Sequence, residues 1–214
     1  PDGLTLLVLS DNVSSSFGSL IAQYELTDAF DITAGVTYSG HSYDLSSLID
    51  QPSGFAFNND GTEVFITNGF HTSERIYAYT LSSAYDISGG LTFDSYLVYE
   101  VPSESLYDLS FNEDGTSLFV MKGALSDQID ELILESPFDL TGTVTLGQTF
   151  SVTSQEDYPQ GFIFSPNGNQ LFVVGSTGDE INQYNLTNEG FVENSSNDGT
   201  IDGSLTIRLV DDFF

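Results

Sequence analysis

Four short apolar runs recur along the chain, and each follows an Asp-Gly or Asn-Gly pair. The four pairs are Asp2-Gly3, Asp60-Gly61, Asp114-Gly115 and Asn167-Gly168. A second marker, an alternating segment, follows each run and begins at Tyr24, Tyr79, Leu132 and Tyr184. These markers are about 50 to 55 residues apart, and a period of that length with several short strands per repeat is typical of a propeller or another repeat array.

Each repeat is expected to contain four strands, and the last copy shows the first three most clearly. Residues 161–164 and 171–175 are apolar strands on either side of a Ser-Pro-Asn-Gly turn, in which proline presets φ and glycine accepts a positive φ. Residues 180–186 alternate as a third strand. Other copies show the fourth strand better, at residues 35–42, 91–101 and 143–152. The second strands are apolar on both faces, which indicates sheets stacked between two neighbours.

An aromatic residue followed by Asp precedes each of these fourth strands. The pairs are Phe30-Asp31, Tyr85-Asp86 and Phe138-Asp139. We expect a structural hinge in which the ring packs and the carboxylate accepts hydrogen bonds from nearby backbone N–H groups.

The fold class that follows is all-β: a β-propeller built from four blades of about 53 residues, each with four strands. The expected blades cover residues 1–51, 52–105, 106–158 and 159–187, either as a complete unit or as part of a larger ring or longer chain. A β-sandwich is the alternative, but it does not explain the fixed period.

Residues 188–214 form an atypical tail. Phe213-Phe214 followed by Pro1-Asp2-Gly3 would reproduce the sequence pattern of residues 164–168, and the first repeat lacks its leading strand. The tail is therefore expected either to supply a closing strand beside residues 4–9, which would remove an exposed sheet edge, or to lead into further chain.

The excess of acidic residues excludes some classes of binding partner. The chain has 32 acidic and 3 basic residues, and the formal net charge is −29. Such a charge repels phosphate backbones and anionic lipid, so we expect no nucleic acid partner and no membrane insertion. It favours solubility and attracts cations. Together with the scarcity of lysine, it favours an extracellular, cell-surface or virion location.

The Asp-Gly hairpins resemble the β-propeller repeats of bacterial and phage surface proteins, of the YVTN and NHL-like kind. The motif is best seen in residues 164–174, and residues 57–66 and 111–120 match the same pattern. The resemblance covers roughly residues 1–187. It implies a secreted, cell-surface or phage-tail module that binds, adheres or displays.

Candidates for catalysis are few. The two histidines, His41 and His71, fall on different elements of neighbouring repeats, so no nucleophile, base and orienting group are expected to meet. The sequence thus predicts a non-enzymatic protein without catalytic residues. A carboxylate-based glycan hydrolase or lyase acting at the propeller channel is the alternative, because paired acids can cleave glycosides without histidine.

Calcium is the best-motivated ligand, because carboxylates and carbonyl oxygens in glycine-turned loops suit this cation. The first candidate site is Asn197, Asp198 and Asp202 in the tail. A second acidic cluster is Asp127, Asp130 and Glu131. The alternative is that all of these are solvated loop residues.

Apolar residues in equivalent loops suggest a surface for a partner. Phe17, Phe70 and Leu125 follow the second strands of the first three repeats, and in a propeller these loops share one rim. The predicted function is therefore binding or display by a rigid surface module, with a protein or a cell-surface glycan as partner, or structural self-assembly into a fibre or layer.

Overall fold

The computed structural model describes residues 2–11, 18–69, 74–99, 104–165, 168–177 and 181–186. These residues form fourteen strands in four antiparallel sheets. No helix in this part of the chain is long and apolar enough to cross a bilayer. The prediction of an all-β fold is confirmed.

Each sheet is a meander whose strands pair in chain order. The first sheet has β1 (Thr5–Ser10), β2 (Leu20–Asp28) and β3 (Asp31–Asp44). The second has β4 (Pro52–Phe57), β5 (Glu63–Asn68), β6 (Arg75–Ser83) and β7 (Asp86–Val98). The third has β8 (Ser105–Phe111), β9 (Ser117–Gly123), β10 (Gln128–Leu134) and β11 (Val144–Ser151). The fourth has β12 (Pro159–Phe164), β13 (Gln170–Gly175) and β14 (Ile181–Asn185).

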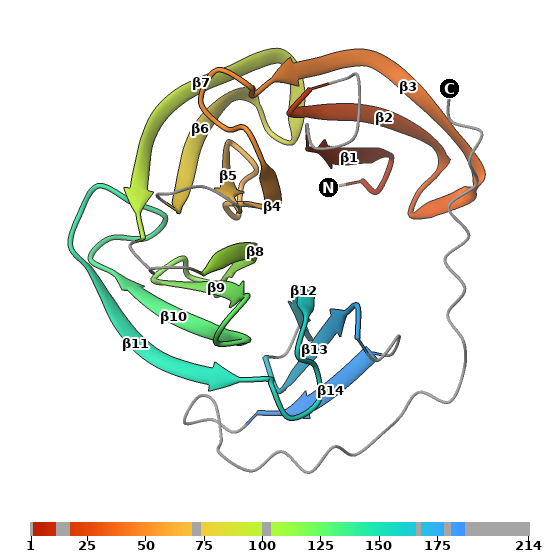
Figure 1. Ribbon diagram of the computed structural model, residues 1–214. Coiled ribbons are helices and arrows are strands. Elements are labelled where there is room, and N and C mark those ends of the chain that lie inside the picture. The colour runs from red at the N-terminus through yellow and green to blue at the C-terminus, as the bar shows by residue number, and fades with distance from the viewer. Residues whose placement is uncertain are drawn as a thin grey trace.

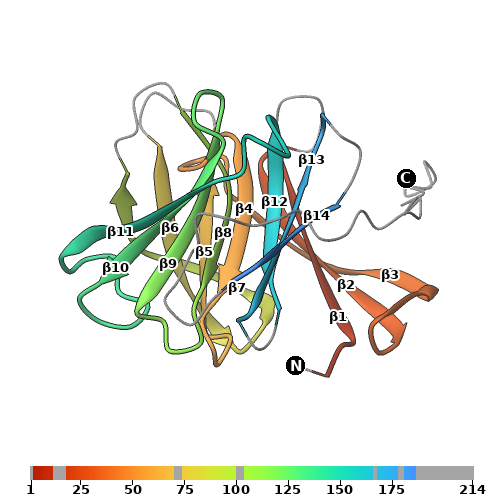
Figure 2. The same cartoon turned by 90° about the horizontal axis from the view of Figure 1, so that it is seen from below.

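The four sheets stand side by side around a common centre (Figure 1). Their first strands β4, β8 and β12 lie innermost, and the long strands β3, β7 and β11 lie outermost. Seen from the side, β4, β8 and β12 run along the axis of the arc (Figure 2). In the first sheet β1 takes the innermost place, so the predicted lack of a leading strand in this repeat is confirmed within the described residues.

Four strands per sheet are confirmed only for the second and third sheets. The segment that would follow β14, and the whole tail of residues 188–214, lie outside the described residues. Closure of the ring by the tail therefore stays a prediction.

The hinge before each outer strand closes on the turn of the same sheet. Phe30, Tyr85 and Phe138 have φ near +60°. Their backbone N–H groups donate to the carbonyls of Gly3, Gly61 and Gly115, at 2.8 to 2.9 Å. Each ring lies over the glycine, so closely that a β-carbon there would come within 2.2 to 2.3 Å of it. Asp31, Asp86 and Asp139 accept N–H bonds from residues two positions later, as predicted for capping carboxylates.

Apolar side chains fill the spaces between neighbouring sheets. Three clusters lie between the first and second, second and third, and third and fourth sheets. Ring pairs cross all three spaces, with centroids 6.2 Å apart for Tyr43 and Tyr79, 4.7 Å apart for Phe65 and Phe111 and 4.8 Å apart for Phe119 and Phe164. Since each sheet buries its faces against its neighbours, stability is roughly a sum over these interfaces.

One buried ion pair interrupts the apolar packing. Lys122 Nζ lies 2.7 Å from an oxygen of Asp130, whose side chain is almost fully buried. Tyr99 and Thr149 also donate to that carboxylate. These bonds and the lysine charge oppose the desolvation that would raise the pKa of Asp130, and the pKa ends below its ordinary value.

Candidate active site at the channel mouth

One position on the inner strands is occupied by glycine in two sheets and by aspartate in a third. Gly54 on β4, Asp108 on β8 and Gly161 on β12 each precede the inner-strand aromatic by three residues. A β-carbon at Gly54 would lie 2.8 Å from Asp108 Oδ1, and one at Gly161 would lie 3.4 Å from Oδ2. The two glycines therefore leave room for the carboxylate between sheets.

The strand register changes at this level in all three inner strands. Irregularities fall between Pro52 and Phe55, between Leu106 and Asp108, and between Pro159 and Gly161. Such bulges re-aim a side chain out of the regular alternation. They explain why a charged residue can occupy a strand that is otherwise buried.

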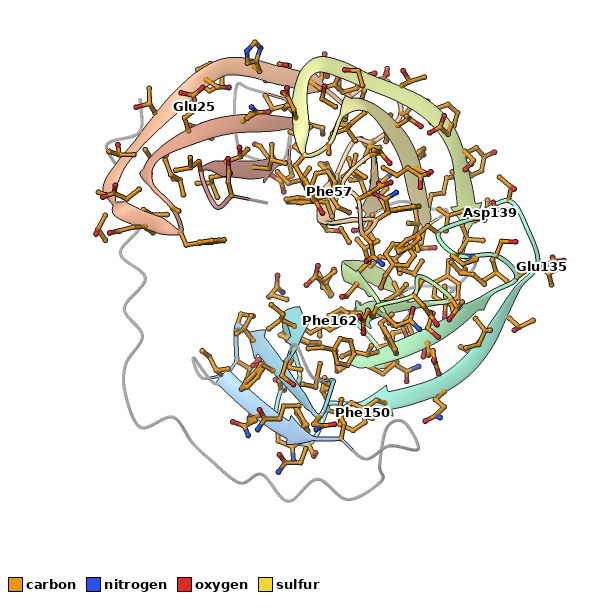
Figure 3. All side chains as sticks on the ribbon, turned by 180° about the vertical axis from the view of Figure 1, so that it is seen from behind. Glu25, Phe57, Glu135, Asp139, Phe150 and Phe162 are labelled. Atoms are coloured by element: carbon orange, nitrogen blue, oxygen red, sulfur yellow. The ribbon has the colours of Figure 1, made fainter. Side chains whose placement is uncertain are left out.

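Asp108 is held by the backbone of two sheets. Its Oδ1 accepts the N–H of Leu109 at 2.9 Å, and its Oδ2 accepts the N–H of Phe162 on β12 at 3.0 Å. Phe162 is among the inner-strand residues labelled in Figure 3. Burial raises the pKa of Asp108 to about 6, although both hydrogen bonds act in the opposite direction. Near neutral pH this carboxyl can therefore both accept and release a proton.

A cavity of about 400 Å³ opens immediately next to this level. Most of its lining side chains are polar or capable of hydrogen bonding. The lining residues are Leu9, Ser10, Asp11, Gln51, Pro52, Ser53, Tyr107 and Gln160. Ser53, Tyr107 and Gln160 directly precede Gly54, Asp108 and Gly161, so the cavity adjoins the level of Asp108, which is not itself a lining residue.

Two side chains of the cavity wall, Gln51 and Ser53, differ in whether their polar atoms already have hydrogen-bond partners among the described residues. The side-chain oxygen Oε1 of Gln51 is buried and has no hydrogen-bond partner within the described part of the chain. Ser53 Oγ donates to the carbonyl of Leu106 at 2.6 Å and lies 2.8 Å from Thr67 Oγ1. Ser53 is therefore fixed as a structural group, whereas Gln51 is available to a ligand hydroxyl.

More acids lie behind Tyr107. Asp127 and Glu156 are buried, and each has one oxygen without a hydrogen-bond partner among the described residues. The pKa of Asp127 is raised, first by burial and then by the charges of Asp157, Glu104 and Glu156. The pKa of Tyr107 is raised chiefly by burial as well. The surroundings of Tyr107 on the cavity wall are thus strongly acidic, which disfavours an anionic ligand.

A second and more apolar cavity, of about 690 Å³, lies at the junction of the first and second sheets. Its wall includes Leu7 on β1 and Phe55 and Phe57 on β4. It occupies the side of β4 on which the first sheet has no inner strand. We interpret it as the space of that strand and not as a catalytic site.

The predicted acidic cluster does not converge. Asp130 is bonded to Lys122, while Glu131, the next residue, accepts the hydroxyl of Ser117 at 2.8 Å. Adjacent strand residues point to opposite faces, so the two carboxylates diverge. Among the described residues no three His, Cys, Asp or Glu side chains are placed to hold a metal ion.

The other predicted site residues are tested only in part. Asn197, Asp198 and Asp202 lie outside the described residues, as do Phe17 and Phe70. Leu125 is 70% exposed on the loop between β9 and β10, so a role in partner binding stays a prediction. His41 is exposed on β3, and His71 lies outside the described residues.

Sequence reasoning missed Asp108. The available signal was a carboxylate at a strand position where the aligned copies carry glycine. Only the bulges and the neighbouring sheets show that its side chain is half-buried near a cavity.

Comparison with known proteins places the fold. No family model matches the chain, and no curated protein matches it. Among solved structures it resembles the periplasmic gluconolactonase of Pseudomonas aeruginosa, with a TM-score of 0.57 and 16% identity over 91% of this chain and 50% of that one. A Bacteroides fragilis protein provisionally named a 6-phosphogluconolactonase gives 0.57 and 17% identity, over 92% and 51%. A luciferin-regenerating enzyme gives 0.50 and 16%, over 80% and 50%.

At these identities the likeness shows the fold alone, that of the β-propeller neighbours. The chain spans about half the length of the solved structures it resembles. The comparison contradicts the prediction of a non-enzymatic module, because the resembled propellers are named as enzymes. That prediction was wrong in treating the absence of a histidine-based triad as the absence of catalytic chemistry, since a buried carboxylate can serve as the acid or base.

Proposed function

We propose that this chain carries the channel site of a carboxylate-based hydrolase that opens a cyclic ester of a sugar acid. The observation that carries the proposal is Asp108, a carboxyl with a pKa of about 6 beside a polar cavity at the centre of the arc. Two of the resembled structures are named as gluconolactonases, and their names supply the substrate class.

Ester opening fits this site better than cleavage of a glycosidic bond. Glycosidases need two carboxyl groups on opposite sides of the scissile bond. The cavity is lined by one acid, Asp11, with Asp108 behind the wall, whereas attack of water on a lactone carbonyl needs one general base. A glycan hydrolase or lyase therefore ranks below a lactonase.

The proposed step uses Asp108 as the base. Above its pKa the carboxylate takes a proton from water as the water oxygen attacks the lactone carbonyl. The tetrahedral intermediate then breaks the ring C–O bond, and the leaving oxygen receives the proton from Asp108. The hydroxyl groups of the sugar acid would meet Gln51, Ser10 and Gln160 on the cavity wall.

The charge around the cavity favours an uncharged gluconolactone over its 6-phosphate ester, the two substrates that the neighbours' names give. The two basic residues in the described part are Arg75, which stacks on Tyr96, and Lys122, which is paired with Asp130. Neither lines the cavity, and the surrounding acids repel phosphate. An uncharged lactone is therefore the proposed substrate. A periplasmic or other extracytoplasmic location is part of the proposal, in line with the acidic composition.

The test is hydrolysis of gluconolactone by the purified chain, followed by acid release and compared with its 6-phosphate ester and with an aryl glucoside. We expect the uncharged lactone to be favoured and kcat/KM to rise with pH through about 6. Asp108→Asn should lower kcat/KM by at least about 100-fold. Asp114→Asn, which alters an exposed turn carboxylate, is the matched control.

Circular dichroism and melting of both variants separate loss of chemistry from loss of fold. No lactone hydrolysis above the spontaneous rate, or full activity in a folded Asp108→Asn variant, would overturn the proposal.

A further inference from the structure

Two buried carboxylates that the proposed hydrolysis does not use lie between the third and fourth sheets. Asp127 is on the loop between β9 and β10, and Glu156 is on the loop between β11 and β12. Their exposed fractions are 9% and 1%. Asp127 Oδ1 and Glu156 Oε2 are each buried without a hydrogen-bond partner in the described part of the chain. Buried charges in proteins are normally paired or bound to a metal ion, so these two oxygens indicate an absent partner.

Two glycines show that both side chains extend into the same space. Gly123 ends β9 on the face that packs against the fourth sheet, and Gly175 ends β13 on the face that packs against the third. A β-carbon at Gly123 would lie 3.3 Å from Asp127 Oδ1, and one at Gly175 would lie 2.5 Å from Glu156 Oε2. The unpartnered oxygen of each acid therefore lies against a glycine in the space between these two sheets.

Backbone hydrogen bonds join the loops that carry the two acids. The N–H of Val152 donates to the carbonyl of Asp127, and the N–H of Glu156 donates to the carbonyl of Val152, both at 2.9 Å. The pKa of Asp127 is raised, first by burial and then by the charges of Asp157, Glu104 and Glu156. Asp127 and Glu156 are therefore close enough to repel one another when both are charged.

The same connection between the first and second sheets is built without acids. There the N–H of Leu45 donates to the carbonyl of Ser19, and the N–H of Ile49 donates to the carbonyl of Leu45, both at 2.8 Å. Ser19 thus corresponds to Asp127, and Ile49 corresponds to Glu156. Both counterparts are uncharged and have 0% exposure. The repeat does not need the two carboxylates for this connection, so their charge has another role.

One oxygen of Glu156 has a structural role that needs no charge. Its Oε1 accepts the N–H groups of Tyr158 at 2.9 Å and Thr177 at 3.2 Å. An amide oxygen at this position would accept the same two bonds. These bonds fix the carboxyl group and hold Oε2 against Gly175.

No basic side chain of the described residues compensates this charge. Lys122 precedes Gly123 on β9, so its side chain points to the opposite face, where it pairs with Asp130. Arg75 stacks on Tyr96 of the second sheet. Within the described part of the chain, compensation is left to a proton or to a bound cation.

We propose that Asp127 and Glu156 bind a calcium ion in the space between the third and fourth sheets. Two carboxylates neutralise the ion, which takes about six to eight oxygen ligands in a flexible geometry. The buried hydroxyl of Ser126, which has no partner among the described residues, is a candidate third ligand, and backbone carbonyls and water complete the shell. The site differs from the diverging sequence-predicted cluster, because Asp130 and Glu131 take no part.

The test is calorimetric titration of calcium into the 214-residue chain after treatment with EGTA. We expect one ion per chain and a dissociation constant of about 0.1–1 mM, the range of extracellular calcium modules. The melting temperature should rise with calcium concentration. Potassium chloride at about 0.15 M screens weak binding to surface acids. Magnesium should bind at least about 10-fold more weakly, because it demands a regular octahedral shell.

Glu156→Gln and Asp127→Asn each remove one charge and retain the size of the side chain. Each should raise the dissociation constant for calcium at least about 10-fold. Glu113→Gln removes a charge from an exposed side chain and is the matched control. In EGTA, Glu156→Gln should melt no lower than the unaltered chain, because the buried charge is gone and the two N–H bonds are kept. In calcium it should melt lower.

Three results would overturn the proposal. One is the absence of calcium-dependent heat or melting in the unaltered chain. A second is equal calcium affinity in Glu156→Gln and Glu113→Gln, which would mean binding to surface acids only. A third is a Glu156→Gln variant destabilised equally in EGTA and in calcium, which would show that a proton satisfies the pair. Lactone hydrolysis can fail without affecting these results, since Asp108 is not part of the site.

Discussion

The interface between the second and third sheets and the face of the fourth sheet that points away from the third sheet share one residue pattern and differ in what covers it. That face carries Ile163, Phe172, Val174 and Ile181. Phe65 is fully buried, with its ring centroid 4.7 Å from that of Phe111. Phe172 holds the same repeat position and stays partly exposed. The repeat thus carries its apolar positions to the ends of the arc, and a sheet of this kind is incompletely buried until it has two neighbours.

The largest difference between the two regions is expected when each phenylalanine is replaced by alanine. Phe65→Ala should lower the free energy of unfolding by about 3–5 kcal/mol, because it leaves a cavity between two sheets. Phe172→Ala should cost the monomer about 1 kcal/mol, since less of its surface is buried. Urea unfolding of both variants measures the two losses. Equal losses would show that Phe172 is already covered within one copy.

The turn glycines Gly61 and Gly168 extend the comparison between the second and fourth sheets to the turns before their apolar strands. Gly61 has a φ of +72° and lies under the ring of Tyr85, whereas Gly168 has a φ of +69° and open space within 4 Å of the point where a β-carbon would lie. Both Ala variants carry the left-handed strain of about 1–2 kcal/mol. Gly61→Ala must also displace the ring, and we expect about 3 kcal/mol against about 1 kcal/mol for Gly168→Ala. Similar melting temperatures for the two would contradict the role of the ring.

Asp108 is a polar residue at an interior interface, and the pH dependence of stability tests whether its carboxyl is desolvated there. Its folded pKa, about 6, lies above the ordinary value of 3.8, so its favourable contribution is complete below pH 3.8 and is lost as pH rises through 6. Relative to Asp108→Asn, the wild-type protein should lose about 2 kcal/mol of unfolding free energy between roughly pH 4.5 and pH 7.5. Denaturant titrations of both proteins at several pH values measure the difference. A constant difference would mean that the carboxylate is solvated.

The smallest effect is expected at Leu125, an exposed apolar residue on the loop between β9 and β10. Leu125→Ser should change the free energy of unfolding by less than about 0.5 kcal/mol, as is usual for surface substitutions. A clearly larger loss would show that Leu125 packs against the rest of the fold.

Much of the fold was predictable because its signals are local. The Asp-Gly turns, the apolar second strands and the hinge of Phe30, Tyr85 and Phe138 each depend on residues close in sequence, and the structure places them as expected. The candidate site was not predictable in this way. Asp130 and Glu131 are neighbours in sequence, yet their carboxylates diverge because alternation along β10 sends them to opposite faces.

The sequence by itself determined the repeating unit: turn geometry, strand alternation and the apolar pattern, all of which act over a few residues. Only the tertiary structure decided that the half-buried Asp108 carboxylate lies between Gly54 and Gly161, and that apolar residues such as Ile163 and Val8 remain exposed on the end sheets. Burial depends on which residues from distant repeats come into contact. Each repeat carries the same apolar pattern whether or not another sheet packs against it, so the pattern alone does not show which faces are covered.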